Sequence, residues 1–184
     1  MQIIRRPWKL KRDDCPCDPD FVDWISEQGL RDQTIFHFGT GEHHLVGLSS
    51  ARSGDGNAVL GVTATPAEHD AYVRLAKVEP EMTKRYVVYF GDIYNVNARL
   101  LPDLDIATLF HLCEFADDRV GYRALNDESL LRMVADRLRP GGRILFYTGS
   151  YAYPRAAPII EAWAASSGFS EVEGFRSLRV FQRA

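Results

Sequence analysis

Two glycines, Gly39 and Gly41, follow directly after a short apolar run at 35–38 and could form a ligand-binding turn. The run is typical of a buried strand. Glycine lets the backbone approach a ligand closely, because it has no Cβ and adopts positive φ at little cost. A helix that begins after the turn would direct unpaired N–H groups and its positive dipole end toward the ligand. The sequence therefore predicts a nucleotide-type site at the carboxyl edge of a parallel sheet.

Imidazoles and a carboxylate also gather where strands are predicted to end. These residues are His37, His43, His44, His111 and Glu114. Neutral imidazole and carboxylate are suitable ligands for zinc or iron. No pair among them has the i, i+4 spacing of a metal-binding helix, so we predict no metal site and leave a histidine metal centre as the open alternative.

The three cysteines form an odd set, which argues against a disulfide framework. Cys15 and Cys17 are too close in sequence for an ordinary zinc knuckle, and Cys113 lies in a separate apolar run. We expect reduced thiols in a cytoplasmic protein.

Strands and helices alternate from residue 18 to residue 168. Helix starts are predicted at Asp18 as N-cap, at Thr65 with Glu68 as a capping box, and at Asn126 as N-cap. Pro140-Gly141-Gly142 is predicted to stop the helix that precedes it. The predicted strands lie at 35–38, 58–62, 86–90, 105–112, 143–147, 170–175 and 178–183.

Apolar strands joined by helical crossovers predict a parallel sheet with helices on both faces. The last two strands are too close for a crossover and must be antiparallel. We therefore expect an α/β three-layer sandwich with a mostly parallel seven-stranded sheet and an antiparallel C-terminal strand pair. Residues 1–17 form a basic N-terminal arm, either solvated or folded over the ligand, and 18–184 a single domain.

Composition predicts an ordinary globular protein. The chain has 184 residues, 46% of them hydrophobic, and a net charge of −3. This charge gives no general attraction to nucleic acid or to an anionic membrane, so we expect a small-molecule substrate, no nucleic-acid partner and no membrane partner. The apolar runs are shorter than the ~20 residues of a spanning helix. The oligomeric state is left open.

The order of these motifs resembles that of the class I S-adenosylmethionine-dependent methyltransferases over nearly the whole chain. The strand and glycine turn at 35–43, the strand end at 61–66 and the segment at 89–93 resemble three cofactor-binding motifs of that family. The run at 105–114 resembles the fourth strand, which faces the methyl donor and the substrate. The turn at 138–145 is similar to the family's common entry into the fifth strand, and it is the most specific match.

This resemblance implies a Rossmann-like, class I methyltransferase-like domain with S-adenosylmethionine as cofactor. The cofactor contacts that it implies are His37, Gly39, Thr40, Gly41, Glu42, Thr63, Asp92, Ile93 and Phe110. His111 and Glu114, at the mouth of the fourth strand, are the catalytic candidates for contact with the methyl acceptor. Tyr147 and Tyr151 are candidates for lining the acceptor pocket.

Three positions depart from the family pattern. The family usually has an acid where His37 stands, a glycine where His43 stands and an acid where Thr63 stands. An acid accepts both ribose hydroxyls, whereas a threonine makes only part of that pairing, and Glu42 or Glu68 could compensate. The leading hypothesis is a methyltransferase for a small-molecule acceptor. The alternatives are a non-catalytic binding or scaffold protein with a degenerate cofactor site and, less well matched, a nicotinamide-nucleotide enzyme.

Overall fold

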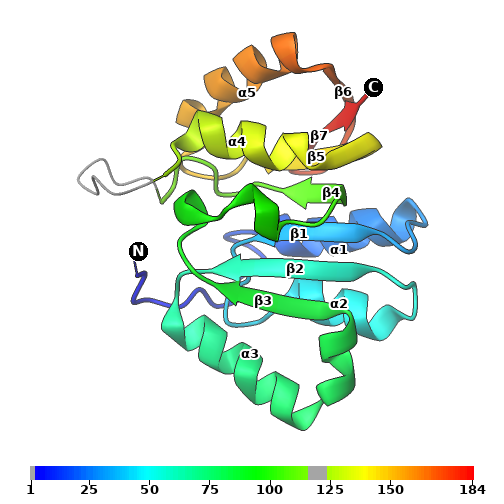
Figure 1. The fold of residues 1–184 in the computed structure, drawn as a ribbon, viewed down its shortest axis with the longest axis vertical. Helices are drawn as coiled ribbons and strands as arrows, with labels where there is room; N and C mark the ends of the chain where they lie inside the picture. The colour runs from blue at the N-terminus through cyan, green and yellow to red at the C-terminus, as the bar shows by residue number, and fades with distance from the viewer. Residues whose placement is uncertain (1–2, 116–123) are drawn as a thin grey trace.

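Seven strands form one sheet in the order β3-β2-β1-β4-β5-β7-β6 (Figure 1). The computed structural model describes residues 3–115 and 124–184. Strands β1 to β5 run parallel, and β7 runs antiparallel to both β5 and β6. The strands are β1 (Thr34–Phe38), β2 (Ala58–Thr63), β3 (Tyr86–Phe90), β4 (Leu104–Thr108), β5 (Leu138–Tyr147), β6 (Phe169–Phe175) and β7 (Leu178–Arg183). This sheet confirms the predicted fold class.

Helices cover both faces of the sheet. The α-helices are α1 (Cys17–Glu27), α2 (Leu45–Ser53), α3 (Pro66–Val78), α4 (Asp127–Asp136) and α5 (Tyr153–Ser167). Short 3₁₀ helices are η1 (Pro80–Lys84), η2 (Ile93–Asn95) and η3 (Ala98–Leu100). One buried cluster joins α1 and α2 to the sheet, and another joins α4 and α5 to it, which gives the three-layer sandwich.

Alternate residues of the central strands enter the two clusters. In β1, Ile35 packs with α1 and α2, whereas Phe36 packs with the α4–α5 cluster. In β5, Leu145 likewise belongs to the α1–α2 cluster and Phe146 to the α4–α5 cluster. Successive strand side chains point to opposite faces, so continuous apolar runs are the pattern of strands buried on both sides.

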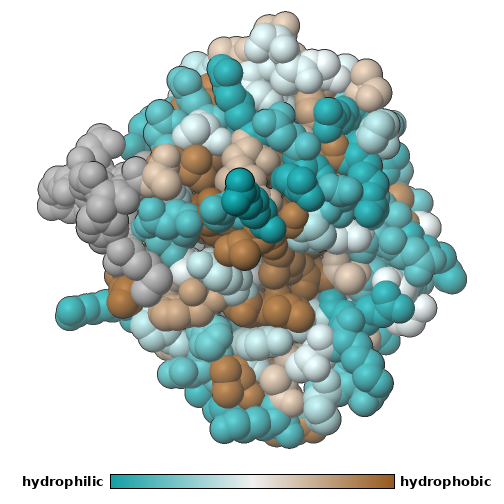
Figure 2. Space-filling view, viewed as in Figure 1, coloured by the Kyte–Doolittle hydropathy of each residue, from teal (hydrophilic) through white to brown (hydrophobic). Residues whose placement is uncertain are grey.

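The edge strand β3 is less well covered on one face. α4 and α5 lie over the opposite half of the sheet in Figure 1, away from β3. Val87 on β3 and Leu100 on η3 are 49% and 62% exposed. Figure 2 accordingly shows apolar side chains reaching the surface near the centre of this view.

The predicted helix starts were partly correct. Asn126 caps α4 as predicted, because its Oδ1 accepts a hydrogen bond from Ser129 N at 2.8 Å. Asp18 is not an N-cap: α1 begins at Cys17 after Pro16, and the Asp18 carboxylate turns toward His37 and His43 instead. α3 begins after Thr65 as predicted, but Glu68 does not complete a capping box, because its carboxylate is bound by other groups.

The predictions for the central strands also need two corrections. Pro140-Gly141-Gly142 does not stop a helix, because α4 already ends at Asp136 and these residues lie within β5. Gly141 has φ +77°, and the β4–β5 register shifts there, which accommodates extra residues on β5. β4 ends at Thr108, earlier than predicted, so His111 lies in the turn that follows.

None of the helices in the described part of the chain combines the length and the apolar character that crossing a membrane requires.

Gly47 places α2 directly on the ring of Tyr86. A Cβ at Gly47 would overlap the Tyr86 side chain, which is fully buried and hydrogen-bonded to His44. Without this contact, alanine would stabilise the helix relative to glycine by about 1 kcal/mol. We expect Gly47→Ala to lower the free energy of unfolding by about 1–3 kcal/mol instead, as measured by urea denaturation. A stabilised variant would contradict this packing.

His44 predicts a pH-dependent stability. Its Nε2 donates to the Glu68 carbonyl at 2.9 Å, so Nδ1 accepts from the Tyr86 hydroxyl at 2.7 Å and the buried ring is neutral. Burial lowers the pKa of His44 to about 4, although the hydrogen bond to the Glu68 carbonyl opposes this shift. The unfolded chain therefore binds a proton more readily than the folded chain between pH 6.5 and 4.

We expect the free energy of unfolding to fall as the pH decreases through this range, by about 3 kcal/mol from this group. His44→Asn removes the titration while keeping a residue that tolerates the left-handed conformation at φ 50°. Urea denaturation across the range should show a shallower pH dependence for the variant than for the wild type. Equal slopes would exclude this role of His44.

Candidate functional site

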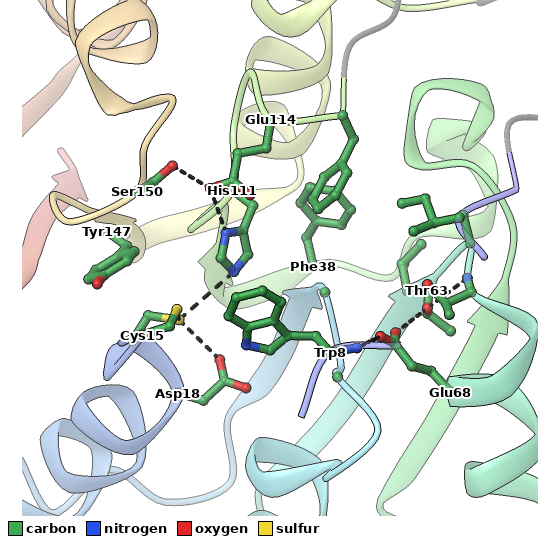
Figure 3. Close-up of a pocket in the computed structure, with 18 of the residues that line it drawn as sticks. Trp8, Cys15, Asp18, Phe38, Thr63, Glu68, His111, Glu114, Tyr147 and Ser150 are labelled. Carbon is green, nitrogen blue, oxygen red and sulfur yellow. Dashed lines mark hydrogen bonds and ion pairs between the residues drawn. The ribbon is translucent and has the colours of Figure 1, made fainter. Parts of the chain in front are cut away.

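A cavity of about 330 Å³ opens at the carboxyl ends of β1, β2 and β4. Its wall includes the glycine turn after β1, the end of β2 and the turns after β3 and β4. α1 and the N-terminal arm complete the wall from the other side (Figure 3). The predicted residues that line it are Gly39, Gly41, Thr63, Asp92, Ile93, His111 and Glu114, together with Tyr147 and Tyr151.

Four predicted cofactor contacts lie away from the cavity lining. His37 is buried, and its Nδ1 lies 2.8 Å from the Thr108 hydroxyl. Phe110 packs edge-on against the rings of Phe21 and His37. Thr40 is also buried, and the backbone N–H of Glu42 donates to the Trp8 carbonyl. The structure therefore gathers only part of the predicted set at one cavity.

The glycine turn has the backbone that the sequence predicted. Gly39 and Gly41 have φ values of +87° and +56°. A Cβ at Gly41 would lie 2.5 Å from His43 Nε2, so the imidazole occupies the space beside Gly41. A Cβ at Gly39 would only touch the His111 ring, at 3.4 Å. The unobstructed backbone of this turn is therefore at Gly39. α2 does not start at the turn but at Leu45.

The end of β2 carries a buried carboxylate from α3. The Thr63 hydroxyl donates to Glu68 Oε2 at 2.6 Å, and the Trp8 N–H donates to Glu68 Oε1 at 2.9 Å (Figure 3). Burial raises the pKa of Glu68, and these two hydrogen bonds partly offset the effect. Thr63 stands where the resembled family usually has an acid. Glu68 places a carboxylate directly beside that position.

The described part of the N-terminal arm is held at this edge of the sheet by main-chain hydrogen bonds, although most of its residues are exposed. Ile4 N donates to the Ala64 carbonyl at 3.1 Å, and the Trp8 carbonyl accepts from Glu42 N at 2.8 Å. Main-chain contacts on both sides hold Trp8 against the cavity, although half of its surface is exposed. The arm thus contributes Ile4, Arg6, Trp8, Leu10 and Asp14 to the cavity lining.

Asp92 and Ile93 occupy the turn after β3. Asp92 Oδ1 accepts from Tyr94 N at 3.0 Å, so this carboxylate caps η2 while also bordering the cavity. It is buried.

His111, Glu114 and Ser150 form a hydrogen-bonded chain on the opposite wall. His111 Nδ1 lies 3.0 Å from Glu114 Oε1, which also accepts from the Ser150 hydroxyl at 2.5 Å (Figure 3). Burial alone would lower the pKa of His111, but hydrogen bonds to Cys15 and Glu114 raise it to about 10. Burial likewise would raise the pKa of Glu114, and His111 lowers it. His111 and Glu114 thus form a hydrogen-bonded imidazole–carboxylate pair.

Sequence reasoning missed three residues that α1 and the turn before it bring to the cavity. Asp18 is buried, with Oδ1 3.6 Å from His37 Nε2 and Oδ2 3.7 Å from His43 Nε2. Burial would raise the pKa of Asp18, but these histidines lower it. Cys15 and Cys17 lie beside it and near His111. An acid at a helix start looks like a cap, so the sequence carried no signal for this arrangement.

No protein-family model and no curated protein matches the sequence. Solved structures nevertheless match its fold. The [4+2]-cyclase SpnF has a TM-score of 0.60 at 17% identity, over 94% of this chain and 65% of that chain. A SAM-dependent methyltransferase from Aquifex aeolicus has a TM-score of 0.59 at 13% identity, over 95% and 98%. A candidate rRNA-methylase from Clostridium thermocellum has a TM-score of 0.61 at 12% identity, over 90% and 96%.

These matches correct one expectation. The expectation that this chain has no nucleic-acid partner was wrong, because it was drawn from the net charge alone. A candidate rRNA-methylase has the same fold. A net charge of −3 describes the whole chain and does not decide what a local surface binds.

Sequence identities of 12–17% mean that these matches show a shared fold and do not show a shared activity. The chain spans 65% of SpnF and about half of two other longer matches. The strand order, the antiparallel C-terminal pair and the structural matches together confirm the predicted resemblance: this chain has the fold of the class I S-adenosylmethionine-dependent methyltransferases.

Proposed function

We propose that this chain is a cytoplasmic S-adenosylmethionine-dependent methyltransferase that acts on a small-molecule acceptor. The observation that carries the proposal is the cavity at the carboxyl ends of β1, β2 and β4, bordered by the bare backbone of Gly39. Its volume of about 330 Å³ lies in the range of small-ligand pockets, which is roughly 300–1,000 Å³.

The residues present fit the cofactor at three places. Gly39 lets the main chain approach it, and Asp92 with Ile93 borders the cavity where the family holds the adenine. Glu68 supplies the ribose-binding acid that Thr63 does not, because each of its oxygens keeps accepting capacity beyond the hydrogen bonds from Thr63 and Trp8. Bound there, S-adenosylmethionine supplies an electrophilic methyl group.

His111, Glu114 and Ser150 face the acceptor side in this proposal. Methyl transfer from a sulfonium depends mainly on positioning of donor and acceptor. Glu114 is held by two hydrogen bonds, so it is a fixed acceptor for a substrate hydroxyl or ammonium group. Trp8 of the arm is part of the cavity lining, and the cavity volume of about 330 Å³ suits a small acceptor. Because SpnF has this fold and is a [4+2]-cyclase, the activity has to be measured directly.

Cofactor binding is the first test. We expect isothermal titration calorimetry to show S-adenosylmethionine and S-adenosylhomocysteine binding with dissociation constants in about the micromolar range. Methyl transfer is then measured as S-adenosylhomocysteine formation with pools of small molecules. Binding of neither ligand would refute the proposal.

Glu68→Gln tests the ribose-side assignment. The amide keeps the size of the side chain but removes the charge, and a hydrogen bond to a charged group contributes about 1.5–3 kcal/mol. We expect S-adenosylmethionine to bind about 10–100-fold more weakly to the variant. Glu173→Gln makes the same change at an exposed position and should bind as the wild type does. Thermal unfolding of both variants separates lost binding from lost folding, and unchanged affinity in folded Glu68→Gln would remove Glu68 from the site.

A further inference from the structure

Two thiols that the proposed methyl transfer does not use meet the His111 imidazole beside the cavity. Cys15 Sγ lies 3.3 Å from Cys17 Sγ, and Cys17 Sγ lies 3.9 Å from His111 Nε2. All three ligand atoms lie within 4.8 Å of one another. Figure 3 shows the Cys15 side chain, the His111 ring and the Asp18 carboxylate pointing toward one another between α1 and the turn after β4.

These separations are close to those around a tetrahedral zinc ion. Zinc–sulfur bonds of about 2.3 Å and zinc–nitrogen bonds of about 2.0–2.1 Å place two ligated sulfurs roughly 3.8 Å apart and a sulfur and nitrogen roughly 3.6 Å apart. The observed 3.3 Å and 3.9 Å need adjustments of only a few tenths of an ångström. The thiols are separate sulfur atoms and not a disulfide.

The chain holds the imidazole in the orientation that a metal ligand needs. Glu114 takes the Nδ1 side of His111, so the Nε2 side faces the sulfurs. Ser150 fixes the same carboxylate oxygen from the other side. A carboxylate that accepts from the second ring nitrogen of a ligating histidine is the usual support of such a ligand.

The cysteine pair is also held in place. The Cys15 N–H donates to the Lys11 carbonyl at 2.8 Å, and Cys17 is the first residue of α1. Pro16 between them has a restricted φ, −80° here, so two sulfurs are presented from one rigid turn. Such preorganisation reduces the entropy lost when a metal binds.

The surroundings of the cluster are compatible with a cation. Metal binding releases the protons of its ligands, because cysteine binds as the thiolate and histidine as the neutral imidazole. The Asp18 carboxylate, with Oδ1 3.6 Å from Cys17 Sγ, adds negative charge beside the cluster.

We propose that Cys15, Cys17 and His111 bind a zinc ion whose fourth coordination position faces the cavity. Two cysteines and a histidine with one open position are the ligand set of a catalytic type of zinc site. Asp18 Oδ1 lies 3.6 Å from Cys17 Sγ, but Asp18 does not belong to the group of mutually close ligand atoms in the described residues, so the proposal leaves the open position to a water or a substrate atom. The inference does not depend on the proposed methyl transfer, because metal binding and cofactor binding are measured separately.

The test uses the whole chain, stripped of metal by a chelator and kept reduced by a phosphine. Zinc affinity is measured by competition with a chromophoric zinc indicator. Co²⁺ is added separately as a spectroscopic probe. We expect one ion per chain, and Co²⁺ should give the thiolate-to-metal charge-transfer band and the d–d bands of a tetrahedral thiolate site.

Variants identify the ligands. Cys15→Ser and Cys17→Ser should each weaken zinc binding by more than Glu114→Gln, for which loss of the supporting carboxylate predicts a loss of roughly 10–100-fold. Cys113→Ser is the matched control, because Cys113 is also buried and free but does not belong to the cluster. It should bind zinc as the wild type does.

Absence of the charge-transfer band in the wild type overturns the proposal, and so does equal zinc affinity in a folded Cys15→Ser/Cys17→Ser double variant. Circular dichroism reports whether each variant folds. If the serine variants do not fold, the wild-type cobalt spectrum decides, together with its retention in Cys113→Ser.

Discussion

The strand order reverses between β1 and β4, and the site depends on this reversal. From β1 the chain builds outward through β2 to β3, and then it crosses to β4 on the other side of β1. The connections after β1 and β4 therefore leave in opposite directions and open a crevice at the carboxyl edge. Because β1 to β4 are parallel, the turns that follow them all reach this edge: Gly39, Thr63, Asp92 and His111 come from four separate segments.

Buried polar groups in the crevice constrain one another. An unpaired charge removed from water is costly, so each one needs a partner. Asp18 is placed between His37 and His43, and Glu114 between His111 and Ser150. The altered motif positions His37 and His43 are thereby explained locally, because they accompany an acid supplied by α1. α1 and the arm therefore line the cavity, and they also supply the Asp18 carboxylate and the two cysteine sulfurs beside it.

Much of the fold was accessible from the sequence, whereas the site was accessible only in part. Strand β3 occurs where its aromatic and β-branched residues predicted it, and Asn126 caps α4, because both signals act within a few residues. The failures share a cause. Asp18 and Glu68 have the right type and position for helix caps, but each finds a stronger partner from another segment, and local signals cannot register that competition. Pro140-Gly141-Gly142 was similarly ambiguous, because the residues that end a helix also permit an irregular strand.

The sequence alone determined the alternation of elements, the antiparallel closing pair and the glycine turn, since periodicity and backbone freedom are properties of neighbouring residues. Only the tertiary structure decided which side chains meet. Cys17 and His111 are 94 positions apart, and Thr63 acquires its acid from α3 and a further hydrogen bond to that acid from Trp8. Such contacts depend on how α1 and the arm pack over the sheet edge, and this is set by burial of the whole core, so no spacing in the chain could reveal them.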